Sequence, residues 1–158
     1  MLVYHPAFDI YHAVRRFLKL LRLSEGQVFS VEHFKLIDYF VVFPSETFKI
    51  RLPMQYADYR KKIKVNKYEA VNNSRIVFQQ LQGYQDAALQ CLAAYAFIDP
   101  LQYKKGAVQL NDTVMSAELN ALLENTLESA NLLDFMNEVL LRMPYEGPVG
   151  LKERSNLF

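Results

Sequence analysis

The chain has 158 residues, of which 51% are hydrophobic and 22% charged, and its formal net charge is +1. This length fits one domain with a sizeable core, and the composition excludes an intrinsically disordered chain. The charge is unevenly divided, because residues 1–67 hold twelve Lys or Arg against six Asp or Glu, while the remainder holds six against eleven. Such a division is typical of a protein that docks between two unlike partners.

The amphipathic pattern in the first half predicts two helices. In residues 8–23, apolar side chains recur at helical spacing and basic side chains line another face. Gly26 lies in the turn that should follow this helix. Ser30 is a candidate cap for an apolar helix over residues 32–43, which Pro44 should end.

The middle of the chain is expected to be more irregular. Residues 45–67 are predicted to form a loop followed by a short basic helix. Residues 75–98 predict two helical pieces joined at Gly83, with Tyr95 among the buried side chains. A short strand is expected over residues 107–110, and a helix that leads into a small β-element resembles the end of a winged-helix unit.

The C-terminal third should contain a long helix or a tight helix pair over residues 113–143, where apolar positions step by three or four. Residues 144–158 hold two Gly and two Pro among their first seven and predict an extended tail. The fold class is therefore mainly α: a winged-helix-like domain over residues 1–143 with a small β-wing, followed by the tail. The apolar side chains of this tail either dock on a partner or fold back on the core.

The cysteine content and hydropathy favour a cytoplasmic location. Cys91 is the only cysteine, so no intrachain disulfide can form, and we expect its thiol to be buried. The longest charge-free apolar stretch, residues 87–98, has twelve residues, whereas a bilayer span needs about 20. The N-terminus also lacks the charged start and apolar run of a secretory signal.

No residue pattern points to catalysis, a cofactor or a metal. His5, Asp9 and His12 are spaced as a helical metal site would be, but Pro6 is better placed at the start of a helix, which moves His5 outside it. We expect Asp9 to be a carboxylate at the helix start and the two His side chains to be surface or packing groups. The chain has neither a nucleophile elbow nor a glycine-rich phosphate loop. We therefore expect a protein that is not an enzyme.

The basic residues of the first half allow three interpretations: a DNA contact, a dock for an acidic protein surface, or a solvated face. The sequence alone does not rank them. The candidate DNA-binding residues are Arg15, Lys19, Arg22, Arg60, Lys61, Lys62, Lys64 and Lys67.

Several stretches resemble the middle component of prokaryotic ABC-three-component systems. They are residues 4–13, 36–44, 50–53, 78–81, 85–94 and 150–154, in the family's order. The resemblance covers nearly the whole chain. It implies a winged-helix-like subunit that joins an SMC-like ABC ATPase to an effector, often a nuclease, in Lamassu-type defence against phages and plasmids.

The resemblance carries no catalytic residues, but it points to conspicuous motif positions that are candidates for partner binding. These are His5, Pro6, Phe8, Asp9, Arg51, Gly150, Leu151 and Arg154. The expected partners are the ATPase subunit, the effector and DNA reached through the complex, without a membrane. The alternative is a free-standing winged-helix DNA-binding regulator, although a recognition helix rich in Arg, Asn, Gln or Ser is not evident.

Overall fold

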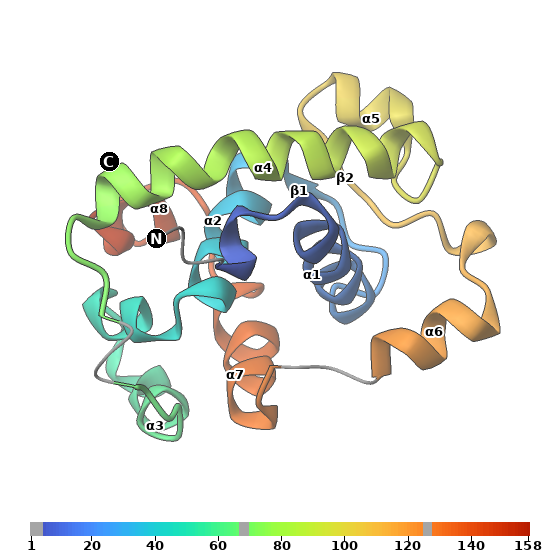
Figure 1. Ribbon diagram of the computed structural model, residues 1–158. Helices are drawn as coiled ribbons and strands as arrows, with labels where there is room; N and C mark the ends of the chain where they lie inside the picture. Colours follow the sequence, from blue (N-terminus) through green and yellow to red (C-terminus); the bar gives the residue numbers. More distant parts are fainter. Residues whose placement is uncertain (1–4, 67–69, 125–127) are drawn as a thin grey trace.

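The computed structural model describes residues 5–66, 70–124 and 128–158 and is mainly helical with one small sheet, as predicted (Figure 1). In chain order the elements are η1 (Pro6–Phe8), α1 (Ile10–Leu23), β1 (Phe29–Ser30), α2 (Val31–Val42), η2 (Pro44–Lys49), η3 (Met54–Tyr56), α3 (Ala57–Lys61), α4 (Ser74–Ala94), α5 (Pro100–Lys104), β2 (Ala107–Val108), η5 (Asp112–Val114), α6 (Ala117–Glu124), α7 (Ala130–Phe135), the π-helical turn η6 (Met136–Leu140) and α8 (Leu151–Ser155).

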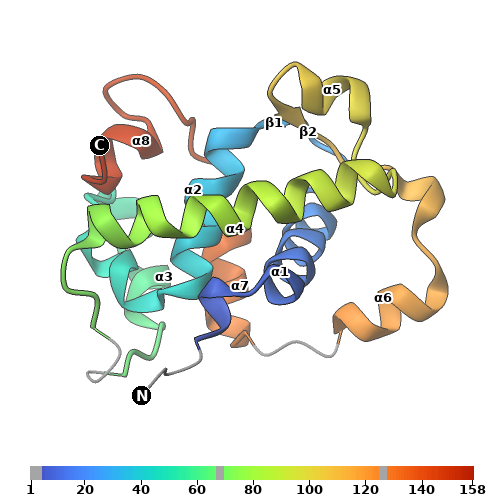
Figure 2. The same ribbon diagram turned by 45° about the horizontal axis from the view of Figure 1, so that its top comes forward.

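The core lies where α1, α2 and α4 meet. Helix α2 is its centre, because all residues from 33 to 41 are buried. Helix α1 packs on both α2 and α4, and Figure 2 shows α4 running across the molecule in front of them. Among the helices of the described ranges, none is both long and apolar enough to cross a bilayer.

The predicted helix starts in the first half are confirmed by their caps. The Asp9 carboxylate accepts a hydrogen bond from the His12 amide at 3.1 Å and begins α1. The Ser30 hydroxyl accepts one from the His33 amide at 3.1 Å and begins α2, which ends two residues before Pro44. These caps can be predicted from the sequence because the capping side chain bonds to an amide only two or three residues further along the chain.

Helix α4 corrects the prediction of two helical pieces, because it runs without interruption through Gly83. A glycine inside a helix costs about 1 kcal/mol relative to alanine. The neighbouring Leu81 and Gln85 are fully buried, and their packing outweighs that cost. Cys91 and Tyr95 are exposed to solvent rather than buried in the core, so the prediction that each is buried was wrong.

The small β-element is confirmed at β2, which pairs antiparallel with β1. Phe29 lies opposite Val108, and both side chains are buried. Strand β1 has two residues and was not predicted, because so short a segment has no readable alternation. The sheet therefore joins the entry of α2 to the segment after α5.

The region predicted as one long helix or a tight helix pair, residues 113–143, contains two separate helices, α6 and α7, in the structure. Ser129 has an extended backbone, with ψ of 151°, and caps α7 through the Leu132 amide at 3.2 Å. A helix cannot continue through an extended residue, so α6 and α7 are separate. Helix α6 packs on α1, and residues 125–127 between the helices lie outside the described part of the chain.

The predicted extended tail is also corrected, because residues 151–155 form α8. Leu151 is fully buried and Leu157 is 7% exposed. The two Gly and two Pro permit a turn at residues 144–150, with Gly147 in a left-handed conformation at φ of +91°. The chain then returns to the core instead of extending away from it.

Candidate partner-binding surface

The basic side of α1 is occupied by contacts within the chain. The Lys19 ammonium donates to the Leu123 carbonyl at 3.0 Å, and the Arg22 guanidinium donates to the Asn120 carbonyl at 3.1 Å. Arg15 forms an ion pair with Glu128 at 2.8 Å. Three candidate DNA-binding residues therefore hold α6 and residue 128 against α1, and these donors are not directed to a nucleic acid.

The other candidate DNA-binding residues lie on and after α3. Lys61, Lys62 and Lys64 are exposed, and Arg60 is half-buried. Lys67 lies outside the described residues. The open part of the predicted basic surface is thus one short segment rather than two faces.

The N-terminal candidates form a small aromatic cluster at the start of α1. His5 caps η1 by accepting from the Ala7 amide at 3.1 Å, and its ring stacks on Phe43 at 5.4 Å. Phe8 contacts Tyr84 edge-on at 5.6 Å. His5 and Pro6 are exposed, so the cluster supports the start of α1 and is also accessible to a partner. In the described ranges, no three His, Cys, Asp or Glu side chains are arranged to hold a metal ion.

The remaining candidates join the segment after η2 to α8. The Arg51 guanidinium donates to the Glu153 carbonyl at 2.9 Å, and the Arg154 guanidinium donates to the Arg51 carbonyl and to that of Val149. Gly150 is buried, and a Cβ on it would collide with the main-chain atoms of residues 145 and 146. In this conformation Gly150 and Leu151 serve the fold, whereas Arg51 remains exposed.

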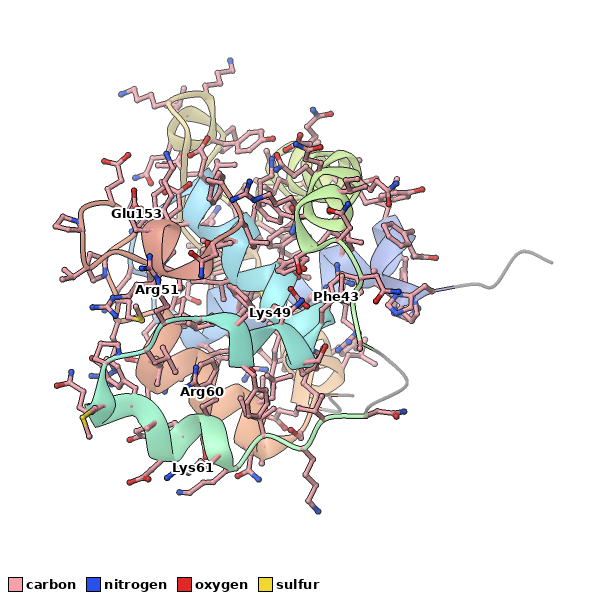
Figure 3. The ribbon with its side chains drawn as sticks, turned by 90° about the vertical axis from the view of Figure 1, so that its left-hand side faces the viewer. Phe43, Lys49, Arg51, Arg60, Lys61 and Glu153 are labelled. Atoms are coloured by element: carbon pink, nitrogen blue, oxygen red, sulfur yellow. The ribbon has the colours of Figure 1, made fainter. Side chains whose placement is uncertain are left out.

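Figure 3 shows the arrangement around Arg51, which lies beside Glu153 of α8, with Arg60 and Lys61 of α3 further along the same side. Phe43 lies apart from these residues, on the side of the N-terminal cluster. The structure therefore brings the candidate partner-binding residues together in two groups, one at η1 and one at the junction of residue 51 with α8.

Buried polar groups fix the helices beneath these surfaces. Arg16 donates to both oxygens of Asp38, at 2.7 and 3.2 Å, and Gln85 donates to Asp38 at 2.9 Å. These residues come from α1, α2 and α4 and are at most 4% exposed. The network sets how the three core helices pack, because each buried charge requires its partner.

A second polar contact anchors η2. The Tyr39 hydroxyl donates to the buried Glu46 carboxylate at 2.9 Å, and Lys49 forms an ion pair with Glu46 at 2.7 Å. Burial, together with the nearby Glu46 charge, raises the pKa of Tyr39. The phenol therefore stays a hydrogen-bond donor, and η2 is held against α2.

An open cavity of about 380 Å³ lies between the start of α1 and the segment after α3. Residues of both predicted sets line it, including His5, Arg15 and Lys64. Arg15 is directed to Glu128 and Arg16 to Asp38, so both guanidinium groups that reach the cavity are already neutralised. The cavity is not an evident anion site.

The sequence analysis singled out the apolar side chains of the tail, which include Val149, but missed the exposure of Met54 and Phe48. Met54 is 95% exposed, Val149 58% and Phe48 47%. Phe48, Ile50 and Leu52 alternate with polar residues, which would place Phe48 on the same face as Ile50. Residues 44–49 instead form η2, so Ile50 is buried while Phe48 is exposed. We call Met54, Val149 and Phe48, together with Arg51, Arg60, Lys61, Lys62 and Lys64, the basic–apolar face.

In the comparison with known families, residues 2–158 match the family described as ABC-three component (ABC-3C) system Middle Component 5. No curated protein and no solved structure shows significant similarity to the chain.

Proposed function

Because the chain belongs to the ABC-3C system Middle Component 5 family, we propose that it is a non-catalytic accessory subunit joining an SMC-like ABC ATPase to an effector. The effector would be a nuclease, and the complex would act in the cytoplasm in Lamassu-type defence against phages and plasmids. The family match over residues 2–158 is the observation that carries this proposal. The uneven charge of the two halves of the chain supports a role between unlike partners.

The free-standing DNA-binding regulator is the weaker candidate. Such a regulator would present a basic helix to the major groove. The most basic helix predicted from sequence is α1, and its cationic groups bind the Leu123 and Asn120 carbonyls and the Glu128 carboxylate. This occupation favours the accessory subunit over the regulator.

The proposal includes a winged-helix-like core made of α1, β1, α2, α4 and β2. Its support is the order of these elements, with β1 directly before α2 and its partner β2 after the last core helix. An experimentally determined structure that superimposes on winged-helix subunits of ATPase complexes over these elements would support this relationship, and failure to superimpose would contradict it.

Co-purification tests the linking role. The chain would be co-expressed with the ATPase and effector encoded beside it, and each of the three proteins would be tagged in turn. We expect one complex of all three, and we expect the ATPase and effector to separate when the chain is omitted. Equal association of the ATPase and effector without the chain would contradict the proposal. A phage and plasmid challenge of cells lacking only this gene gives the functional readout.

A further inference from the structure

We propose that the basic–apolar face docks an acidic segment of a partner protein, with Met54 and Phe48 as apolar anchors. The inference deepens the proposed function only in naming which surface and which partner chemistry are used. The surface itself is defined by the fold and stands without that function.

Two apolar members of the face, Phe48 and Val149, are linked to its cationic members by contacts, and Met54 lies three residues after Arg51 in the same segment. The Arg60 guanidinium lies over the Phe48 ring at 6.0 Å and donates to the Ile50 carbonyl at 2.6 Å. Arg154 bridges the Val149 carbonyl and the Arg51 carbonyl. Phe48, Arg51, Arg60 and Val149 are therefore neighbours, and the face is continuous from η2 to the start of α8.

Among the described residues, Lys61 is the one cationic member of the face with an acidic partner, and that pair is weak. Lys61 and Asp58 approach at 3.9 Å, and both side chains are largely exposed, at 78% and 89%. In the described part of the chain, no carboxylate lies within ion-pair distance of Arg51, Arg60, Lys62 or Lys64. The face thus carries an uncompensated positive charge that an acidic partner would complement.

Several cationic side chains of the face are held in place by contacts, which also suits a protein partner. Arg51 is exposed and donates one guanidinium N–H to the Glu153 carbonyl, so this contact positions the group and leaves its other N–H groups open to a partner. The half-buried Arg60 is positioned in the same way by its bond to the Ile50 carbonyl. Binding them would cost less side-chain entropy than binding free arginines. Lys62 lies over the Tyr59 ring at 5.9 Å and is similarly supported.

A protein segment fits this face better than a nucleic acid does. A duplex offers mainly phosphates and sugars to such a surface and would leave Met54, which is 95% exposed, without an apolar contact. Protein interfaces instead place Met, Phe and Arg side chains at their centre and charges at the rim. The contact of Phe48 with Arg60, and the position of Met54 between Arg51 and Arg60 in the sequence, therefore favour an acidic segment with its own apolar residues.

The test has a binding arm on the pure full chain. Three probes are titrated by fluorescence anisotropy at low and high salt: a 20-residue Glu/Leu peptide, a Lys/Leu peptide of the same length and a 20-bp DNA duplex. We expect the acidic peptide to bind most tightly and to weaken with salt. Met54→Ala, and separately Lys61→Glu with Lys62→Glu, should each lower its affinity about tenfold. The matched controls, Leu101→Ala and Lys104→Glu with Lys105→Glu on α5, should not.

A photo-crosslinking arm identifies the partner in cells that express all three components. A benzophenone amino acid replaces Met54, or Leu101 as the control, and the crosslinked peptides are sequenced. A crosslink from position 54 to an Asp/Glu-rich segment of another component supports the proposal. A crosslink to a second copy of this chain, to a basic segment or to nothing overturns it, although the complex itself still forms.

The two arms separate failure of this inference from failure of the proposed function. If no three-component complex forms, the proposed function fails and the binding arm alone decides the inference. Tighter binding of the duplex than of the acidic peptide, or equal losses in the face and control variants, would overturn the inference even where the complex is intact.

Discussion

Arg51 and Arg154 bind each other's main chain: the Arg51 amide donates to the Arg154 carbonyl at 3.0 Å, and the Arg154 guanidinium donates to the Arg51 carbonyl. This reciprocal contact joins residues that are more than 100 positions apart. The C-terminal residues are therefore part of the fold, and the choice left open by the sequence is decided in favour of folding back on the core.

Deleting residues 147–158 is expected to lower the melting temperature strongly, because it removes the buried Leu151 and Leu157. The finer test is Leu151→Ala, which should cost about 2–5 kcal/mol and roughly 10 °C. Val149→Ala, two residues away and 58% exposed, is the matched control and should change little. Circular dichroism melts measure both, and equal melting temperatures for the two variants would contradict a structural role.

The buried pair of Arg16 and Asp38 predicts a non-additive pair of substitutions. Arg16→Met alone leaves the Asp38 carboxylate buried without its cation, and we expect a loss of about 3–5 kcal/mol in the free energy of unfolding. The double variant with Asp38→Leu should lose much less, because Gln85 keeps a partner in the Lys35 carbonyl. Urea denaturation measures both. Additive losses would mean that the pair is not the source of the stability.

His33 makes stability depend on pH. Burial lowers the pKa of His33 below its ordinary value of 6.5, although the hydrogen bond from its Nε2 to the Leu140 carbonyl opposes the shift. Below pH 6.5 the unfolded chain therefore binds more protons than the folded chain. The stability that neutral His33 contributes is complete above pH 6.5 and is lost as the pH falls through the folded pKa.

The corresponding experiment compares the free energy of unfolding of the wild type and of His33→Gln between pH 7.5 and 5.0. Glutamine can keep a donor for Leu140 but cannot titrate. We expect the wild type to lose more stability on acidification, with an extra slope of at most about 1.4 kcal/mol per pH unit. Parallel curves for the two proteins would contradict titration of a buried imidazole.

The sequence predicted the features that depend on a few neighbouring residues. The caps at Asp9 and Ser30, the end of α2 before Pro44 and the strand at residues 107–108 are all local. The sequence left open whether residues 113–143 form one helix or two and did not place the break at Ser129, because the apolar spacing continues through that residue. At Gly83 the sequence predicted a break that the structure does not have, since tertiary packing outweighs the low helix propensity of glycine.

The sequence says less about the candidate site than about the fold, and the partner-binding and DNA-binding residues remain predictions. Charge is visible in sequence, but whether a cation is free depends on which carbonyls and carboxylates the fold brings to it. Lys19 and Lys61 look alike in the sequence, yet Lys19 donates to the Leu123 carbonyl and Lys61 is largely exposed. The exposure of Met54 is equally non-local, because it depends on how the short turn η3 lies against the rest of the protein.

The pure protein is expected to hydrolyse neither nucleotides nor nucleic acids. The sequence lacks a glycine-rich phosphate loop. Asp9, the acid between His5 and His12, caps a helix by accepting a hydrogen bond from the His12 amide. ATPase assays and plasmid cleavage with Mg²⁺ or Mn²⁺ measure the two activities. Activity that is abolished by His5→Ala or His12→Ala would overturn the expectation, whereas activity unaffected by both would indicate a contaminant.

The contacts between α1 and α6 give the last prediction. Replacing Lys19 and Arg22 by Ala removes two charged donors from the Leu123 and Asn120 carbonyls, and each such bond contributes about 1.5–3 kcal/mol. We expect the amides of α6 to exchange with solvent at least tenfold faster, while α2 is unchanged. Lys61→Ala with Lys62→Ala is the matched control and should leave α6 exchange as it is, because neither ammonium contacts that helix. If instead α6 keeps its protection and the Lys19/Arg22 variant loses affinity for a DNA duplex, the basic side of α1 would be a DNA contact, and the regulator would become the better candidate function.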